Sequence, residues 1–188
     1  MLSSDTSNDQ VILVDQHDQE MGLTDKLAAH QHGQLHRAIS VVIFRQQDGQ
    51  LQTLLQQRAS HKYHSANLWS NTCCSHPRPS ESTLASAERR LQEEMGMKGE
   101  LTHCGSFIYR AELENGLVEH ELDHVFCGTL EAPCSFTINP DEAQDAKWVA
   151  ISELQQDLDK HPERYSSWLK QVLEIAVLTR QEPPHPVD

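Results

Sequence analysis

The sequence predicts a single α/β (α+β) domain in which a mixed β-sheet is sandwiched by helices. Two hairpin turn signals, Asp48-Gly49 and Asn115-Gly116, each separate a pair of segments with strand-like composition. Amphipathic helical patterns lie between and after these pairs, at 82–95, 151–158 and 166–178. A chain of 188 residues suits one domain with a sizeable core. Strands mixed with a few helices therefore indicate helices packed on a sheet.

The strands follow from short apolar runs and the turns between them. We expect strands, in chain order, at 11–14, 39–45, 51–57, 105–111, 117–127 and 147–149. Between the third and fourth of these runs, residues 58–80 carry no regular pattern and contain aromatic, His, Cys and Pro residues. Loops of that length inside a small domain are often functional.

The segment 82–95 has the strongest helix pattern in the chain. Ser82 is a suitable N-cap and Gly96 can close the C-terminus. One face carries an apolar stripe of Leu84, Ala87, Leu91 and Met95. Arg90 and Glu94 lie one turn apart beside that stripe, a spacing typical of a surface ion pair worth about 0.3–0.5 kcal/mol. A carboxylate at the edge of a buried face also suits Mg²⁺.

Composition limits the domain and its surroundings. Polar or Pro-rich tails at 1–9 and 181–188 are expected to fray around one domain at 10–180. The net charge of −13 argues against a nucleic-acid surface. No run is apolar enough to predict a membrane span or a secretory signal. Five Cys, an odd number, do not suggest a disulfide framework, so we expect reduced thiols in a cytoplasmic protein.

The acidic helix resembles the Nudix box when the residues before it are included. The matching positions are Glu81, Arg89, Leu91, Glu93, Glu94, Gly96 and Met97. Two positions depart from the pattern: Ser75 stands where Gly is usual, and Arg90 stands where the family has Glu. The resemblance implies the Nudix fold. An Arg in place of an acid weakens metal clustering and favours direct diphosphate contact, so it argues against ordinary diphosphate hydrolysis.

The segment from Trp69 to Pro77, Trp-Ser-Asn-Thr-Cys-Cys-Ser-His-Pro, is similar to the active-site segment of type I isopentenyl-diphosphate isomerases, which use the Nudix fold. By that resemblance, Cys74 is the catalytic thiol and His76 a metal ligand. Cys73 stays a rival, because the sequence does not show which thiol faces a pocket. An isolated Cys is more often a small buried hydrophobe.

Acids alternate along the predicted strand at 117–127. Glu119, Glu121 and Asp123 point to one face, where neighbouring carboxylates repel unless a cation lies between them. A solvated acidic face explains the same alternation. Beside Cys74 and His76, the segment resembles the Glu-x-Glu of the family, which implies that both glutamates bind the metal and that Glu121 transfers protons.

The resemblance implies the rest of the site. His30 and His36 match the first two His ligands, with His32 an alternative to His30, and three imidazoles with two carboxylates suit Mn²⁺ or Zn²⁺. Tyr109 matches a tyrosine that bonds the catalytic Glu, and Trp168 an aromatic that faces a carbocation. A lone Trp on such a helix is more often part of the core. The residues that match the diphosphate-binding group are Lys26, Arg58, Lys62, Ser75 and Arg90, with Glu94 holding Mg²⁺.

The expected activity is conversion of isopentenyl diphosphate to dimethylallyl diphosphate by protonation and deprotonation through a tertiary carbocation. The expected ligand is thus a small isoprenoid diphosphate, and we expect neither nucleic acid nor a membrane as a partner. We expect the protein itself to be a monomer or a homodimer. One alternative is a Nudix hydrolase of a nucleoside or prenyl diphosphate. Another is a metal-binding or regulatory module that has lost activity.

Overall fold

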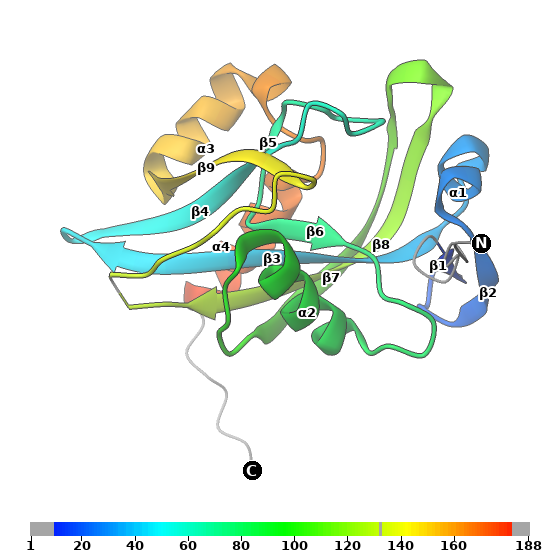
Figure 1. Cartoon of the computed structure of the whole chain (residues 1–188), viewed down its shortest axis with the longest axis horizontal. Helices are drawn as coiled ribbons and strands as arrows, with labels where there is room; N and C mark the ends of the chain where they lie inside the picture. Colours follow the sequence, from blue (N-terminus) through cyan, green and yellow to red (C-terminus); the bar gives the residue numbers. More distant parts are fainter. Residues whose placement is uncertain (1–9, 132, 182–188) are drawn as a thin grey trace, which may run out of the picture.

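The long strand β3 (His36–Gln47) organises a mixed sheet of nine strands (Figure 1). The computed structural model describes residues 10–131 and 133–181. The tails expected at 1–9 and 181–188 lie outside the described residues, except that Gln181 ends a helix. The elements besides β3 are β1 (Gln10–Val14), β2 (Glu20–Asp25), α1 (Lys26–His32), β4 (Gln50–Arg58), β5 (Trp69–Ser70), β6 (Cys73–Ser75), α2 (Thr83–Met95), β7 (Thr102–Glu112), η2 (Glu114–Gly116), β8 (Val118–Thr129), β9 (Ala143–Ala150), α3 (Ile151–Lys160), η3 (Pro162–Arg164) and α4 (Leu169–Gln181).

The two edges of β3 are used differently. Along one edge, β3 pairs in parallel with β8 from His36↔Glu121 to Phe44↔Thr129. Along the other edge, β1, β6 and β4 pair with successive parts of β3, all antiparallel. Strands β7 and β9 extend the sheet beyond β8 and β4. Strand β6 and the middle of β8 therefore flank the same part of β3, residues 39–41, one on each side.

Helices cover both faces of the sheet and define two cores (Figure 1). Helix α2 packs Leu91 and Met95 on one face, against Ile39 and Val41 of β3. Helices α3 and α4 cover the opposite face in a second cluster of buried residues. Side chains alternate along a strand, so successive residues of β3 contribute to different cores. The sandwich of a mixed sheet between helices agrees with the predicted fold class.

Helix α2 has the predicted ends. The side chain of Ser82 accepts a hydrogen bond from the backbone N–H of Ala85, and Gly96 closes the helix in the left-handed conformation at φ 62°. A Cβ at position 96 would lie 3.2 Å from the carbonyl oxygen of Thr137, a tight contact that adds to the preference for glycine set by the left-handed backbone. The predicted apolar stripe is wrong at Leu84, which is 41% exposed.

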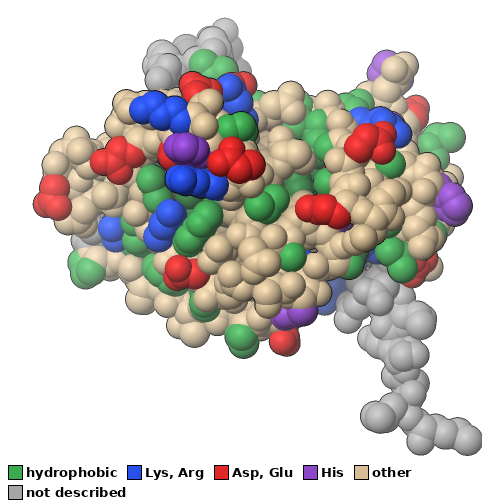
Figure 2. All heavy atoms as spheres, turned by 90° about the horizontal axis from the view of Figure 1, so that it is seen from above, with side chains coloured by type: hydrophobic (Ala, Val, Ile, Leu, Met, Phe, Trp, Pro, Cys, Tyr) green, Lys and Arg blue, Asp and Glu red, His purple; other side chains and the backbone are tan. Residues whose placement is uncertain are grey.

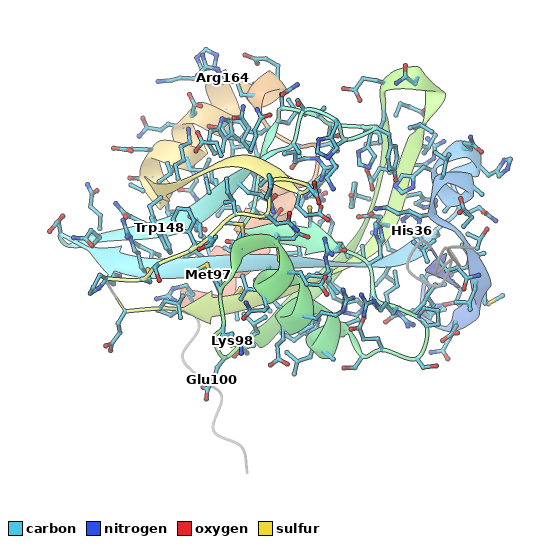
Figure 3. All side chains as sticks on the ribbon, in the orientation of Figure 1. His36, Met97, Lys98, Glu100, Trp148 and Arg164 are labelled. Carbon is cyan, nitrogen blue, oxygen red and sulfur yellow. A yellow bond between two sulfur atoms is a disulfide. The ribbon has the colours of Figure 1, made fainter. Side chains whose placement is uncertain are left out.

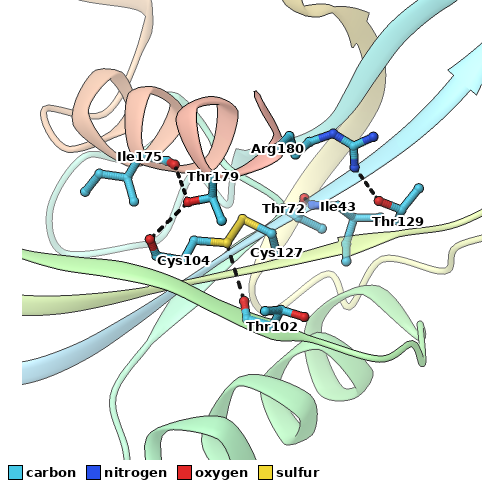
Figure 4. The surroundings of a disulfide bond; sticks show 9 residues. All are labelled: Ile43, Thr72, Thr102, Cys104, Cys127, Thr129, Ile175, Thr179 and Arg180. Atoms are coloured by element: carbon cyan, nitrogen blue, oxygen red, sulfur yellow. Dashed lines mark hydrogen bonds between the residues drawn. A yellow bond between two sulfur atoms is a disulfide. The ribbon is translucent and has the colours of Figure 1, made fainter. Parts of the chain in front are cut away.

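Two cysteines differ from the expectation that all thiols are free. Cys104 and Cys127 form a disulfide between β7 and β8, beside α4 (Figure 4). Their Cα atoms are 6.4 Å apart, within the range that a disulfide spans. The free cysteines among the described residues are Cys73, Cys74 and Cys134. The expectation is therefore wrong for one pair and leaves both site candidates free.

The surface carries mixed charge. On the face seen in Figure 2, most of the basic side chains lie toward the left of the view, with acidic and His side chains among them. Within the described residues, no helix has both the length and the apolar character needed to cross a bilayer.

Candidate active site

A cavity of about 550 Å³ opens between the loop after β4, β6, α2 and the β7–β8 hairpin. The loop after β6 and the loop before β9 complete its walls. The residues predicted for catalysis and for diphosphate binding all line this cavity: Lys26, Arg58, Lys62, Cys74, Ser75, Arg90, Tyr109, Glu121 and Trp168. Residues from 26 to 168 thus converge on one volume.

Five side chains beside the cavity form a cluster whose ligand atoms all lie within 4.8 Å of one another. Its members are His30, His36, His76, Glu119 and Glu121. They come from α1, the start of β3, the loop after β6, and β8. The structure brings His30 into this cluster, whereas the alternative His32 is exposed on α1. His36, labelled in Figure 3, lies at the end of the sheet near α1.

Local structure positions each ligand. Asp25 caps α1 by accepting from the N–H of Ala28 at 3.0 Å, and Gly33 ends the helix at φ 61°, which turns the chain toward β3. The parallel register of β3 and β8 then places His36 opposite Glu121. Glu119 and Glu121 share one face of β8, as the alternation predicts, and both are buried.

The three imidazoles are oriented by the backbone or by their partners. The Nδ1 atoms of His30 and His36 lie 2.7 Å and 2.8 Å from the carbonyl oxygens of Lys26 and Gln34. Each of these two rings therefore turns its Nε2 atom toward the carboxylates, the arrangement seen in metal-binding histidines. His30 Nε2 lies 3.1 Å from Glu119, and His76 Nε2 lies 2.9 Å from Glu121.

Two buried atoms of the cluster have no hydrogen-bond partner among the described residues: Nε2 of His36 and Oε2 of Glu119. Buried polar atoms are normally paired, so unpaired ones require an explanation. A divalent cation accounts for both, because an imidazole nitrogen and a carboxylate oxygen are metal-ligand atoms. The cluster is compatible with a divalent metal ion.

Burial lowers the pKa values of histidines in the cluster and raises that of Glu119. It lowers the pKa of His76 to about 3, so its imidazole is neutral, the form that binds metals. Burial also raises the pKa of Glu119, and the nearby Glu121 carboxylate raises it further. Burial also works against ionisation of Glu121, but its contacts with His36 and His76 outweigh that effect and lower its pKa. The ionised Glu121 therefore disfavours ionisation of Glu119, and a bound cation would relieve that repulsion.

The two adjacent thiols lie on opposite faces of β6. Cys73 is fully buried in the core under α2, and Cys74 lines the cavity. Burial raises the pKa of Cys74 to about 12, and the nearby Arg58 guanidinium opposes that rise by favouring the thiolate. The Arg58 Nη1 atom lies 3.9 Å from its sulfur. The geometry therefore makes Cys74 the thiol that faces the cavity.

Glu121 faces the same cavity from the other edge of β3. Tyr109, its cross-strand partner on β7, donates a hydrogen bond of 2.7 Å to Oε2. His76 contacts the other oxygen, so both carboxylate oxygens are held. Cys74 and Glu121 are thus carried by β6 and β8 on either side of β3 and reach one cavity.

Trp168 closes the cavity from the core that contains α4. The residue is 3% exposed, and its indole N–H donates to Asn71 Oδ1 at 3.1 Å. The Arg58 guanidinium lies 5.4 Å from the centre of its ring, within cation–π range. Trp168 is therefore both a core residue and a wall of the cavity. The two interpretations of its sequence position, a packed core residue and an aromatic that faces the substrate, are compatible.

Cations crowd one part of the cavity. Burial lowers the pKa of Lys26, and the nearby positive charges of Lys62 and Arg58 lower it further. Arg90 lies within 2.7 Å of Glu94, which is 2% exposed and also accepts from Gln56 Nε2 at 2.8 Å. Such a concentration of cations within a chain of net charge −13 is the electrostatic feature expected of a cavity that takes an anion.

Among the cavity-lining residues that sequence reasoning missed, His64 and Glu142 contact predicted site residues. His64 is 7% exposed, and its ring stacks on His30 with ring centres 5.2 Å apart. Glu142 contacts Lys62 and Arg90. His64 lies two positions after Lys62 in the segment 58–80 but belongs to no recognisable spacing. Glu142 lies in a loop far from every motif, so no sequence signal marks it.

Comparisons with known proteins agree with this geometry. The model of the NUDIX domain matches residues 34–172. The crystal structure of DR0079 from Deinococcus radiodurans superposes with a TM-score of 0.70 at 15% identity, covering 88% of this chain and 97% of that one. The NUDIX domain of NrtR from Shewanella oneidensis, complexed with ADP ribose, gives 0.61 at 18% identity, covering 79% and 88%. At such identities these structures show the fold alone.

Sequence relatives are much closer. Isopentenyl-diphosphate Delta-isomerase 2 of Aromatoleum aromaticum is 52% identical over 172 residues, covering 92% of this chain and 88% of the relative. The isomerase of Pectobacterium atrosepticum is 49% identical over 162 residues, covering 86% and 87%. The fold and the acid-bearing helix define a Nudix-domain protein. Within that class, the chain belongs to the isopentenyl-diphosphate Delta-isomerase family.

Proposed function

We propose that this protein converts isopentenyl diphosphate to dimethylallyl diphosphate, with Cys74 and Glu121 as the two proton carriers. The observation that carries the proposal is a thiol and a carboxyl group lining one cavity beside a cluster of cations. Relatives at about half identity, all named as isopentenyl-diphosphate isomerases, support the reaction.

The reaction moves one double bond. A proton adds to the terminal alkene carbon, which becomes a methyl group and leaves a tertiary cation at its neighbour. Loss of a proton from the carbon on the diphosphate side then forms the new double bond. In the forward direction Glu121, in its carboxylic acid form, gives the first proton, and Cys74, as a thiolate, takes the second. A turnover then leaves Glu121 ionised and Cys74 protonated, so a proton must return from Cys74 to Glu121 before the next one. Net atoms and charge are unchanged over the cycle, so no redox partner is needed.

The cavity protects the cation between the two steps. Tyr109 and Trp168 present aromatic surface to it, and burial of both rings excludes water that would trap the cation. A desolvated cation–π contact contributes about 2 kcal/mol. Enzymes supply roughly 8–23 kcal/mol in total, so most of the barrier reduction must come from oriented proton carriers and cavity electrostatics.

Diphosphate binding holds the small alkene in place. Lys26, Arg58, Lys62, Ser75 and Arg90 would contact the diphosphate, and Glu94 would hold a Mg²⁺ ion on it. Binding energy at this end is used for positioning, which can lower the barrier by several kcal/mol when the reacting atoms are held close together.

The cluster of three histidines and two glutamates would hold one Mn²⁺ or Zn²⁺ ion. When bound, such a cation supplies positive charge that stabilises both carboxylates and orients Glu121. The protein contributes neutral imidazoles, the Tyr109 hydrogen bond and a buried setting. We also expect the protein to act in the cytoplasm as a monomer or homodimer.

The test is incubation of the purified protein with isopentenyl diphosphate and Mg²⁺ in D₂O, followed by NMR. Dimethylallyl diphosphate carrying deuterium is the expected product. Release of phosphate without that product would instead identify a hydrolase, a reaction that Arg90 at a Nudix-box acid position disfavours. Metal binding without any turnover would identify a regulatory module.

A further inference from the structure

Glu142 is a carboxylate on the cavity wall that has no role in the reaction described above. It precedes β9, and its side chain is 23% exposed. One carboxylate oxygen pairs with Lys62 Nζ, and the other lies 3.0 Å from Arg90 Nη2. A single acid thus bridges two cations, one from the loop after β4 and one from α2.

The backbone holds Glu142 in this place. Its carbonyl oxygen accepts from the N–H of Ala59 at 3.0 Å, and its own N–H donates to the carbonyl of Asn139 at 2.9 Å. The N–H of Asn139 in turn donates to the carbonyl of Glu94 at 2.8 Å. The loop is therefore tied to the end of β4 and to α2, so the carboxylate is positioned before any substrate binds.

The bridge changes what the cavity offers to an anion. Among the residues that the structure describes, Lys62 has Glu142 as its single ion-pair partner. Nη2 of Arg90 is shared between Glu142 and Glu94, the latter at 2.7 Å. An incoming diphosphate must therefore compete with Glu142 for both cations and also meets its negative charge. A divalent cation bound to the diphosphate offsets that charge.

We propose that Glu142 is a specificity-determining residue that restricts the cavity to metal-complexed diphosphate by competing with free anions for Lys62 and Arg90. The inference rests on the diphosphate site proposed above. It explains why two of the binding cations are neutralised in advance: a site with unpaired cations would also retain free phosphate and other cellular anions.

The test is calorimetric titration of the full-length protein with inorganic pyrophosphate, with and without Mg²⁺. Glu142→Gln keeps the size of the side chain and removes its charge, and Glu142→Ala is a second variant in case the first does not fold. Asp141→Asn is the matched control, because it removes the same charge one residue away on an exposed side chain. Thermal unfolding checks that every variant is folded.

Both Glu142 variants should bind metal-free pyrophosphate more tightly, by about tenfold or more, as expected when a like charge a few ångströms away is removed. The gain in affinity that Mg²⁺ provides should shrink by a similar factor, and Asp141→Asn should match the wild type. Metal-free affinity that is unchanged or weaker in both variants would overturn the proposal. If the wild type fails to bind Mg²⁺-pyrophosphate and does not isomerise, the diphosphate site itself is wrong.

Discussion

Replacing each of the two adjacent thiols by serine separates chemistry from packing. Cys74 lines the cavity beside Arg58, and a serine hydroxyl there is a much weaker acid than a thiol. A positioned proton carrier contributes about 10²–10⁴-fold to a rate, so Cys74→Ser should lower kcat by that factor. Cys73 is 0% exposed in the core under α2, so Cys73→Ser buries a hydroxyl at a cost of roughly 1–3 kcal/mol.

The assay follows conversion of isopentenyl diphosphate by NMR below the unfolding temperature, and thermal unfolding is measured for each variant. Cys73→Ser should keep most of the turnover and unfold several degrees lower, since 1 kcal/mol shifts Tm by about 2–4 °C in a domain of this size. Cys74→Ser should show the reverse pattern. Cys134→Ser, the third free cysteine, is the control and should change neither quantity. Loss of turnover in Cys73→Ser with retention in Cys74→Ser would refute the assignment.

Three further outcomes follow from contacts in and near the cavity. Tyr109→Phe removes a 2.7 Å hydrogen bond to Glu121. Because hydrogen bonds to charged groups are worth about 1.5–3 kcal/mol, kcat should fall roughly tenfold to a hundredfold while the affinity for Mn²⁺ stays nearly unchanged. An unaltered kcat would contradict a role for Tyr109 in positioning Glu121. Glu94→Gln should raise the Mg²⁺ concentration needed for half-maximal rate, whereas an identical titration curve removes Glu94 from the site. Hydrogen bonding from Arg89 lowers the pKa of Glu81 from its ordinary 4.5, so Glu81→Gln should cost roughly 1–2 kcal/mol of unfolding free energy at pH 7; since a depressed pKa stabilises above pH 4.5, this difference should shrink in urea titrations as the pH falls below that value.

Elements with strong local signals could be predicted, and elements held by tertiary contacts could not. Helix α2 has both caps within its own sequence, and both hairpins have an Asp-Gly or Asn-Gly turn. Strand β2 (Glu20–Asp25) has no buried residue, since its sequence shows no apolar alternation, and it is held by pairing with β1. Strands β5 and β6 are two and three residues long, so only their pairing with β4 and β3 defines them.

The candidate site shows the same division. Motif spacing identified Cys74, His76, Glu119 and Glu121 as candidates. The choice between Cys73 and Cys74, however, depends on which face of β6 lines the cavity. The Cys104–Cys127 pairing depends on a shift in register between β7 and β8, which no count of cysteines reveals. Residue spacing in the sequence thus identifies which types of side chain form the site, whereas long-range packing decides which of two neighbouring candidates faces the cavity.

The acids of the Nudix box have been redistributed in this chain. Glu81 is held by two bonds from Arg89, at 2.7 Å and 2.8 Å, and Glu93 accepts from both Arg89 and Arg90. Only Glu94 among the three is buried beside the cavity, and Arg90 pairs with it as well.

Pairing with arginines offsets the charge of these three carboxylates, so the helix is less suited to gathering several divalent ions, although Glu94 at the cavity could still hold one. Among the described residues, the unpaired buried carboxylate oxygens instead belong to Glu119 and Asp123 on β8, and Glu119 lies next to the three histidines. Under the function proposed above, the metal would be held beside β8, the strand that carries Glu121, rather than on the helix. That arrangement would leave the helix to bind the diphosphate while the chemistry takes place at the other end of the cavity.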